Sequence, residues 1–186
     1  MARLGLPTRF IAWQARSGRS AGIAERHIDL LAEVLDALAD ILALDLVFVP
    51  FFVGAPHDDV SVARRVAARM RHAVAVIEGE RRPAVVKGVM ACAALGVGTA
   101  NHFAVFAASS GVPVVALYDT PYMRRKFEGL AALLPGLVLP FGLPADTREV
   151  IQAAERLMRD PGRPTLPDRF DALSWLLAMA RERGRV

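Results

Sequence analysis

The sequence predicts an α/β protein built around a doubly wound, mostly parallel sheet of about six strands. Short apolar runs alternate with segments in which apolar residues recur at helical spacing. Glycine, proline or aspartate stands at most junctions between the two kinds of segment. Because parallel strands must be joined by crossovers, which helices usually provide, this alternation predicts right-handed βαβ units.

The predicted strands are short apolar runs. The run LVFVPFF is uninterrupted, as in a strand buried on both faces, and Pro50 falls near its end, where a missing donor is tolerated. We expect strands, in chain order, at 9–14, 46–52, 73–77, 94–97, 112–117 and 137–140.

The predicted helices show apolar periodicity and recognisable ends. Asp58 or Asp59 can cap the second helix and Asp146 a later one, and Gly111 ends a short apolar helix. We expect helices at 23–42, 59–71, 82–93, 101–110, 121–134, 146–158 and 171–183. His27 is expected to lie partly buried on a helix face, His57 in a solvated turn and His72 at a helix end.

The composition is that of one α/β domain spanning residues 1–186, in which 160–186 form a proline-rich connection and a final helix. The chain is 54% hydrophobic, yet its longest apolar stretch, 91–117, is broken by glycines, Asn101, His102 and Pro113. No run reaches the ~20 apolar residues that a membrane-spanning helix needs. A single cysteine, Cys92, excludes an internal disulfide, and the first residues lack the apolar core of a signal peptide, so we expect a cytoplasmic protein.

The net charge of +4 comes from arginines scattered along the chain, since only Lys87 and Lys126 are lysines. A skewed genomic composition would produce the same excess of arginine over lysine. Aromatic residues make up 7% of the chain and the arginines do not cluster, so no nucleic-acid partner is expected.

In parallel sheets, ligands bind beyond the carboxyl ends of the strands, where the strand order reverses. This rule selects four loops, at 16–22, 51–59, 96–102 and 117–126. The third, GVGTANH, follows a strand and opens a helix, whose first free N–H groups favour an anion. It lacks the third glycine of the dinucleotide fingerprint. An alternative is a tight turn with Thr99 or Asn101 as helix cap and His102 packed in the core.

The segment around this loop resembles the polysaccharide pyruvyl transferase family. The matching features are His102, Phe106-Ala107, the turn from Gly111 to Pro113, and YDTPYMRRKF with Tyr118, Tyr122 and Lys126. The VFVPFF run followed by Asp58 also looks like that family. The resemblance covers roughly residues 9–135, and the arginine that the family carries two residues before its histidine is replaced by Ala100.

The resemblance implies one of two Rossmann-like domains facing a cleft, as in GT-B glycosyltransferases, with this chain similar to the C-terminal domain. It also implies transfer of a pyruvyl group from phosphoenolpyruvate to a glycan or lipid-linked sugar acceptor. His102 would be the catalytic acid, and no metal or other cofactor would be needed. Binding residues would be Gly98, Thr99, Asn101, Tyr118 and Lys126, with charge from Arg16, Arg19, Arg124 or the neighbouring Arg125.

Two other functions stay open on the sequence alone. One is a GT-B glycosyltransferase domain for a nucleotide sugar, in which Glu78 or Glu80 would hold the ribose hydroxyls. The other is a non-catalytic half that binds a ligand or a partner subunit.

A half-cleft of such an apolar chain would expose hydrophobic surface. We therefore predict a homo-oligomer or a complex with a partner subunit that supplies the missing N-terminal half, with contacts through Trp175, Leu176 and Leu177. Light scattering of the purified chain should give a mass above 20.1 kDa. A monomeric mass at high concentration would contradict this prediction.

Overall fold

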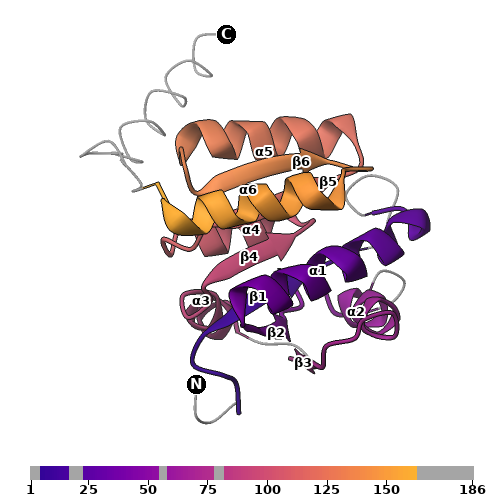
Figure 1. Ribbon diagram of the computed structural model, residues 1–186. Coiled ribbons are helices and arrows are strands. Elements are labelled where there is room, and N and C mark those ends of the chain that lie inside the picture. The colour runs from indigo at the N-terminus through magenta and orange to yellow at the C-terminus, as the bar shows by residue number, and fades with distance from the viewer. Residues whose placement is uncertain (1–4, 17–22, 55–57, 78–81, 163–186) are drawn as a thin grey trace, which may run out of the picture.

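The computed structural model describes residues 5–16, 23–54, 58–77 and 82–162. Six strands form one sheet in the order β3-β2-β1-β4-β5-β6, and every neighbouring pair is parallel. The predicted α/β class and strand number are therefore confirmed (Figure 1). The strands are β1(Phe10–Gln14), β2(Asp45–Phe48), β3(Val74–Val76), β4(Leu95–Gly98), β5(Val114–Tyr118) and β6(Val138–Gly142).

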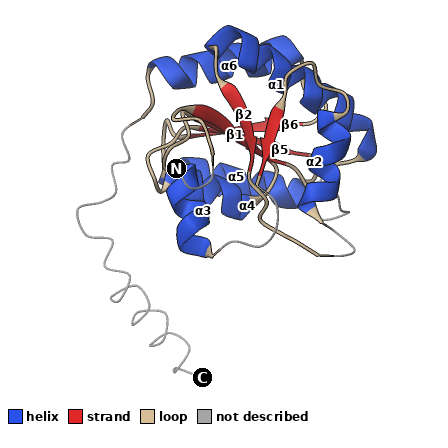
Figure 2. Cartoon of the chain, turned by 90° about the horizontal axis from the view of Figure 1, so that it is seen from below, coloured by secondary structure: helices blue, strands red, loops and turns tan. Residues whose placement is uncertain are grey.

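Helices cover both faces of the sheet, as Figure 2 shows. Helices α1(Ile28–Leu42), α2(Asp59–Ala67) and α6(Thr147–Arg159) pack on one face, and a short 3₁₀ turn, η2(Glu25–His27), precedes α1. The opposite face carries α3(Pro83–Met90), α4(Asn101–Ala108) and α5(Pro121–Leu133). The arrangement is the doubly wound one that right-handed crossovers produce.

The strand order reverses at β1. The chain moves from β1 outward to β2 and β3, and then returns to place β4 on the other side of β1. Trp13 of β1 pairs with Phe48 of β2 and with Val97 of β4, so β1 is hydrogen-bonded on both edges. At such a reversal, parallel sheets commonly form a ligand crevice beyond the carboxyl ends of the strands.

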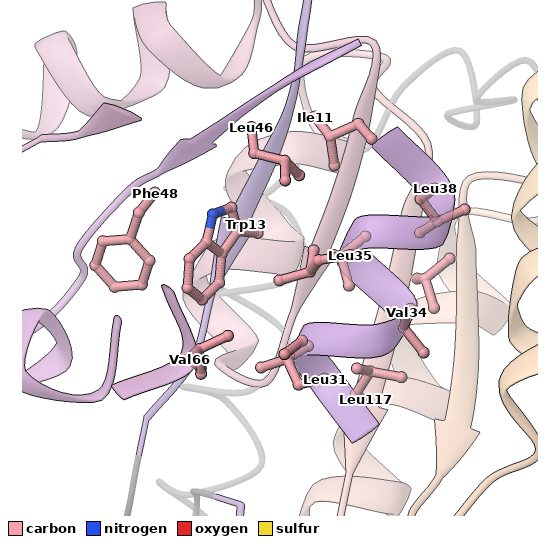
Figure 3. Packing of buried hydrophobic residues seen from close by; sticks show 14 of the residues in the cluster. Ile11, Trp13, Leu31, Val34, Leu35, Leu38, Leu46, Phe48, Val66 and Leu117 are labelled. Carbon is pink, nitrogen blue, oxygen red and sulfur yellow. The ribbon is translucent and has the colours of Figure 1, made fainter. Parts of the chain in front are cut away.

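Side chains of β1 alternate between two cores. Ile11 and Trp13 point toward α1, while Phe10 and Ala12 point toward α3 and α4. Figure 3 shows Trp13 between Phe48 and the Leu31–Leu35 stripe of α1. The Trp13 and Phe48 rings meet edge to face with centroids 4.7 Å apart, a favoured aromatic geometry.

The strand predicted at 46–52 ends at Phe48, which is earlier than expected. Pro50 has no N–H to donate, and the N–H groups of Phe51 and Phe52 donate to the side chain of Asp59. A β-ladder needs such N–H donors. Because these two donate to Asp59 instead, the strand does not continue past Phe48.

The helix predicted to reach Arg71 ends at Ala67. The N–H groups of Arg71 and His72 donate instead to the carboxylate of Asp36 on α1, at 2.8 and 3.1 Å. His72 therefore does not sit at a helix end, and its ring nitrogens lie 3.0 Å from Asp36 Oδ1 and 3.0 Å from Asp40 Oδ1.

The helix predicted at 171–183, with Trp175, Leu176 and Leu177, lies outside the described residues, as does most of the proline-rich connection. Among the helices of the described residues, none combines the length and apolarity needed to cross a lipid bilayer.

Gly98 allows the close approach of α4 to β4. A Cβ at this position would lie 2.4 Å from Cδ1 of Phe103, a side chain that is fully buried. We predict that Gly98→Ala lowers the free energy of unfolding by about 1–3 kcal/mol through overpacking. The matched control is Gly88→Ala in α3, which meets nothing within 4 Å and should raise stability by about 0.5–1 kcal/mol. Equal effects of the two substitutions in urea denaturation would contradict this prediction.

Asp36 makes the fold sensitive to acid. Burial raises its pKa, but hydrogen bonds from Arg71 and His72 together with the charge of Arg71 outweigh burial, so its pKa lies below the ordinary 3.8. A lowered folded pKa contributes stability that is present above about pH 4 and is lost as the pH falls through the folded value. We expect the unfolding free energy of the wild type to fall more steeply below about pH 4 than that of Asp36→Asn.

The control for this acid sensitivity is Asp40→Asn, because the Asp40 side chain is 49% exposed and accepts no N–H from the backbone of the described residues. It should keep the acid-dependent slope of the wild type in denaturation measured across this pH range. Parallel curves for Asp36→Asn and the wild type would show that Asp36 is not the group responsible.

Candidate functional site

The candidate site lies at the carboxyl edge of the sheet, where the loops after β1, β2, β4 and β5 meet. The four loops that the sequence selects follow these four strands. Hydrogen bonds between residues more than 40 positions apart join the first three loops, and a separate set joins the fourth loop to the start of α1. The edge is therefore built by long-range polar contacts.

Gln14 is the residue on which three of these loops converge. It is the last residue of β1 and is fully buried. Its amide nitrogen Nε2 donates to Asp59 Oδ2 at 2.9 Å. Its amide oxygen Oε1 accepts from the N–H of Ala100 at 3.0 Å and from the N–H and hydroxyl of Thr99 at 3.3 and 3.4 Å. Both ends of one side-chain amide are thus used to bridge the β2–α2 and β4–α4 loops.

Asp59 forms the second part of this network. Asp58, not Asp59, caps α2, because Asp58 Oδ1 accepts from the N–H of Val60. The carboxylate of Asp59 is fully buried and accepts from Gln14, from the N–H groups of Phe51 and Phe52, and from Arg16. A buried carboxylate needs such a set of donors to offset its lost hydration.

Arg16 follows β1 at the carboxyl end of the sheet. Its Nε donates to Asp59 Oδ1 at 3.0 Å, its backbone N–H donates to Thr99 Oγ1 at 3.1 Å, and its guanidinium lies 5.1 Å from the ring centroid of Phe52. The side chain is 26% exposed. Within the part of the chain that the structure describes, its two terminal nitrogens have no hydrogen-bond or ion-pair partner.

The first turn of α4 lies next to this network and carries no side-chain cap. The N-cap residue is Ala100, so neither Thr99 nor Asn101 caps the helix. Thr99 is buried and bonded to Gln14 and Arg16, whereas Asn101 is half-buried. His102 is exposed. The alternative prediction, in which Thr99 or Asn101 caps the helix and His102 packs in the core, is therefore wrong.

The loop after β5 forms a second, smaller part of the edge. Tyr118 and Arg124 line a cavity of about 240 Å³ together with Asp119, Thr120, Pro121 and Leu143. Arg124 is exposed and its Nε donates to Glu128 Oε1 at 2.7 Å, which raises the pKa of Arg124. Lys126 does not line this cavity; its Nζ lies 4.7 Å from the ring centroid of Tyr122 on the exposed side of α5.

Asp119 joins this cavity to the start of α1. Its carboxylate accepts from the N–H of Ala24 at 3.1 Å and from Arg26 at 3.2 Å, and it lies 3.3 Å from Nε2 of His27. His27 is buried, more deeply than its place on an amphipathic helix predicts. Arg16 is therefore held by Thr99 and Asp59, and Ala24 is held by Asp119.

The structure brings together five of the residues predicted for the site, namely Arg16, Gly98, Thr99, Asn101 and His102. Tyr118 and Arg124 lie in the neighbouring cavity, and Lys126 lies apart. Arg19, Glu78 and Glu80 fall outside the described residues. The sequence analysis did not identify Gln14, Asp59 or Asp119 as site residues. The available signal was a polar residue at or directly after the end of an otherwise apolar strand, as Gln14 and Asp119 are.

The described residues contain no group of three or more His, Cys, Asp or Glu side chains placed to hold a metal ion. The donors and acceptors at this edge suit an anionic organic ligand, since N–H groups and arginines bind phosphate and carboxylate oxygens.

No family model matches the sequence, and no curated protein matches it. Some solved structures are similar to this chain. One is of a protein described as a UDP-N-acetylglucosamine 2-epimerase from Listeria monocytogenes, with 16% identity and a TM-score of 0.57 over 100% of this chain. Another is the UDP-GlcNAc 2-epimerase from Neisseria meningitidis bound to UDP-GlcNAc, with 19% identity and a TM-score of 0.49 over 82% of this chain.

The match covers 48% of the Listeria protein, so this chain spans about half of its length. At such identities the similarity concerns the fold alone. The Listeria structure supports the Rossmann-like fold that the sequence resemblance implies and does not support the pyruvyl transferase family. The chain has a Rossmann-like α/β fold that is similar to about half of the Listeria structure.

Proposed function

We propose that the chain is the donor-binding half of a GT-B-like, sugar-modifying enzyme whose donor is a nucleoside diphosphate sugar. The observation that carries this proposal is the first turn of α4. It has no side-chain cap, it presents Asn101 and the exposed His102, and it lies beside Arg16 at the strand-order reversal. Backbone N–H groups at a helix N-terminus and an adjacent guanidinium are suited to diphosphate oxygens.

The cavity beside Tyr118 and Arg124 would hold another part of the same donor. Its volume of about 240 Å³ is below the roughly 300 Å³ at which pockets hold a whole small ligand. It lies at the end of β5, next to β4 in the sheet, so one extended ligand could reach both places. A nucleoside diphosphate sugar is extended and has polar groups at both ends.

His102 would serve the reaction itself. Its imidazole is exposed, so it is free to meet a ligand, and histidine exchanges protons near neutral pH. In this proposal it is the acid or base that acts on the sugar, while the second half of the enzyme covers the crevice and binds the acceptor.

A second candidate is pyruvyl transfer from phosphoenolpyruvate to a cell-surface glycan. This function is favoured by His102, which is exposed and matches the histidine of the pyruvyl transferase family. Against it, Ala100 is 6% exposed and replaces the family's arginine, and Arg16 already donates one nitrogen to Asp59. Phosphoenolpyruvate would therefore meet fewer cations here than in that family.

The test is a calorimetric titration of UDP-GlcNAc and of phosphoenolpyruvate into the wild type and His102→Ala. We expect UDP-GlcNAc to bind the wild type and His102→Ala to weaken its binding roughly tenfold or more, or about 1.4 kcal/mol. Thermal stability should not change, because an exposed side chain contributes little to stability. The matched control is Ser109→Ala, which alters an exposed residue at the other end of α4.

Three outcomes would contradict the proposal. Binding of phosphoenolpyruvate alone would identify the pyruvyl transferase candidate. Binding of neither ligand would favour the non-catalytic half. A loss of about 2 kcal/mol or more of stability in His102→Ala with unchanged binding would show a structural histidine.

A further inference from the structure

We infer that Asp59 is a positioning residue that holds Arg16 as the receptor for the phosphate oxygens of the ligand. This inference rests on the proposed function, since it names the side chain that meets the ligand's anionic part. It also gives a role to a buried carboxylate that the sequence alone suggests only as a helix cap.

Asp59 is itself fixed in place. It is fully buried, and its Oδ2 accepts from Gln14 Nε2 at 2.9 Å and from the N–H groups of Phe51 and Phe52, each at 3.0 Å. Two of the three donors to Oδ2 are backbone groups and the third is a fully buried side chain. The remaining oxygen, Oδ1, therefore has a defined position, and it accepts from Nε of Arg16.

Arg16 is consequently held from several sides. Asp59 binds its Nε, Thr99 binds its backbone N–H, and Phe52 lies 5.1 Å from its guanidinium. The bond to Asp59 uses Nε and leaves the two terminal nitrogens without a partner among the described residues. These nitrogens form the planar fork that binds two phosphate oxygens at once.

Other arginines at this edge are less fixed. Arg26 has a side chain that is 68% exposed and donates a terminal nitrogen to Asp119. Arg124 is 60% exposed and is paired with Glu128, itself 47% exposed. Among the described arginines at this edge, Arg16 combines a buried counter-ion, a side chain only 26% exposed and terminal nitrogens without a described partner. A group ordered before the ligand arrives loses less entropy on binding.

The pairing also changes what a substitution should do. Asp59 offsets the charge of Arg16, so attraction by net charge is small and the direction of the terminal N–H groups matters more. A lysine would keep the charge but would lose the fork and the Nε contact. Arg16→Lys should therefore weaken phosphate binding about as much as Arg16→Ala does.

The experiment measures pyrophosphate and UDP-GlcNAc affinity by calorimetry for the wild type, Arg16→Lys and Arg16→Ala. We expect each variant to bind pyrophosphate roughly tenfold more weakly or worse. Millimolar guanidinium should restore affinity to Arg16→Ala, because it can occupy the gap between Asp59 and Phe52. The matched control, Arg71→Lys, alters an arginine paired with the buried Asp36 near the amino end of β3 and should bind like the wild type.

The role of Asp59 is tested by adding Asp59→Asn to Arg16→Ala, which should abolish rescue by guanidinium. Where that protein does not fold, Phe52→Ala serves instead, since Phe52 is 41% exposed and its loss should weaken pyrophosphate binding several-fold. Guanidinium rescue that persists without Asp59, or a Phe52→Ala variant with unchanged affinity, would overturn the positioning role.

The two proposals can fail separately. Tight binding of UDP-GlcNAc that Arg16→Lys leaves unchanged overturns the role of Arg16 and keeps the proposed function. Pyrophosphate binding that depends on Arg16, with UDP-GlcNAc binding no more tightly than pyrophosphate, supports the inference and overturns the nucleotide sugar. Absence of pyrophosphate binding with tight UDP-GlcNAc binding overturns the role of Arg16 alone, and absence of binding by both ligands overturns both proposals.

Discussion

The buried amide of Gln14 holds the carboxyl edge of this sheet together. At the end of the central strand, its nitrogen binds the loop after β2 and its oxygen binds the loop after β4. These loops lie on either side of the strand-order reversal, where parallel sheets open. An apolar residue at position 14 would leave the N–H of Ala100 without this acceptor and Asp59 without one of its donors. The geometry of Arg16, and with it the candidate anion site, depends on that single side chain.

Three aspartates shape the loops in the same way: Asp36 and Asp59 are buried, and Asp119 is partly buried. Asp36, Asp59 and Asp119 each accept at least one backbone N–H from a distant loop segment. Each carboxylate also meets an arginine, so the charge is paired as well as hydrogen-bonded. Such groups are costly to bury unless all their donors are in place, which favours one loop conformation over its alternatives.

The order and type of the elements could be read from the sequence, because apolar periodicity and glycine or proline punctuation are local properties. The helix after Gly98 and the exposed His102 belong to the same local pattern. Gln14 and Asp59 could not be assigned in this way, since their roles depend on β1 lying between β2 and β4. The early end of β2 has the same origin: Phe51 and Phe52 look like strand residues until Asp59, seven or eight positions later, accepts their N–H groups.

A contact near the amino ends of the strands, opposite the candidate site, has a practical consequence. Gly162 donates its N–H to the carbonyl of Gly136 at 2.8 Å, and a Cβ on either glycine would lie 2.6 Å from the Cα of the other. The two glycines press together just before β6 begins, so the chain leaves α6 at the amino edge. A surface linker or a fluorophore joined directly after Gly162 would start on the side away from Gln14. Immobilising the protein from that point would leave Gln14 and Arg16 on the side away from the support.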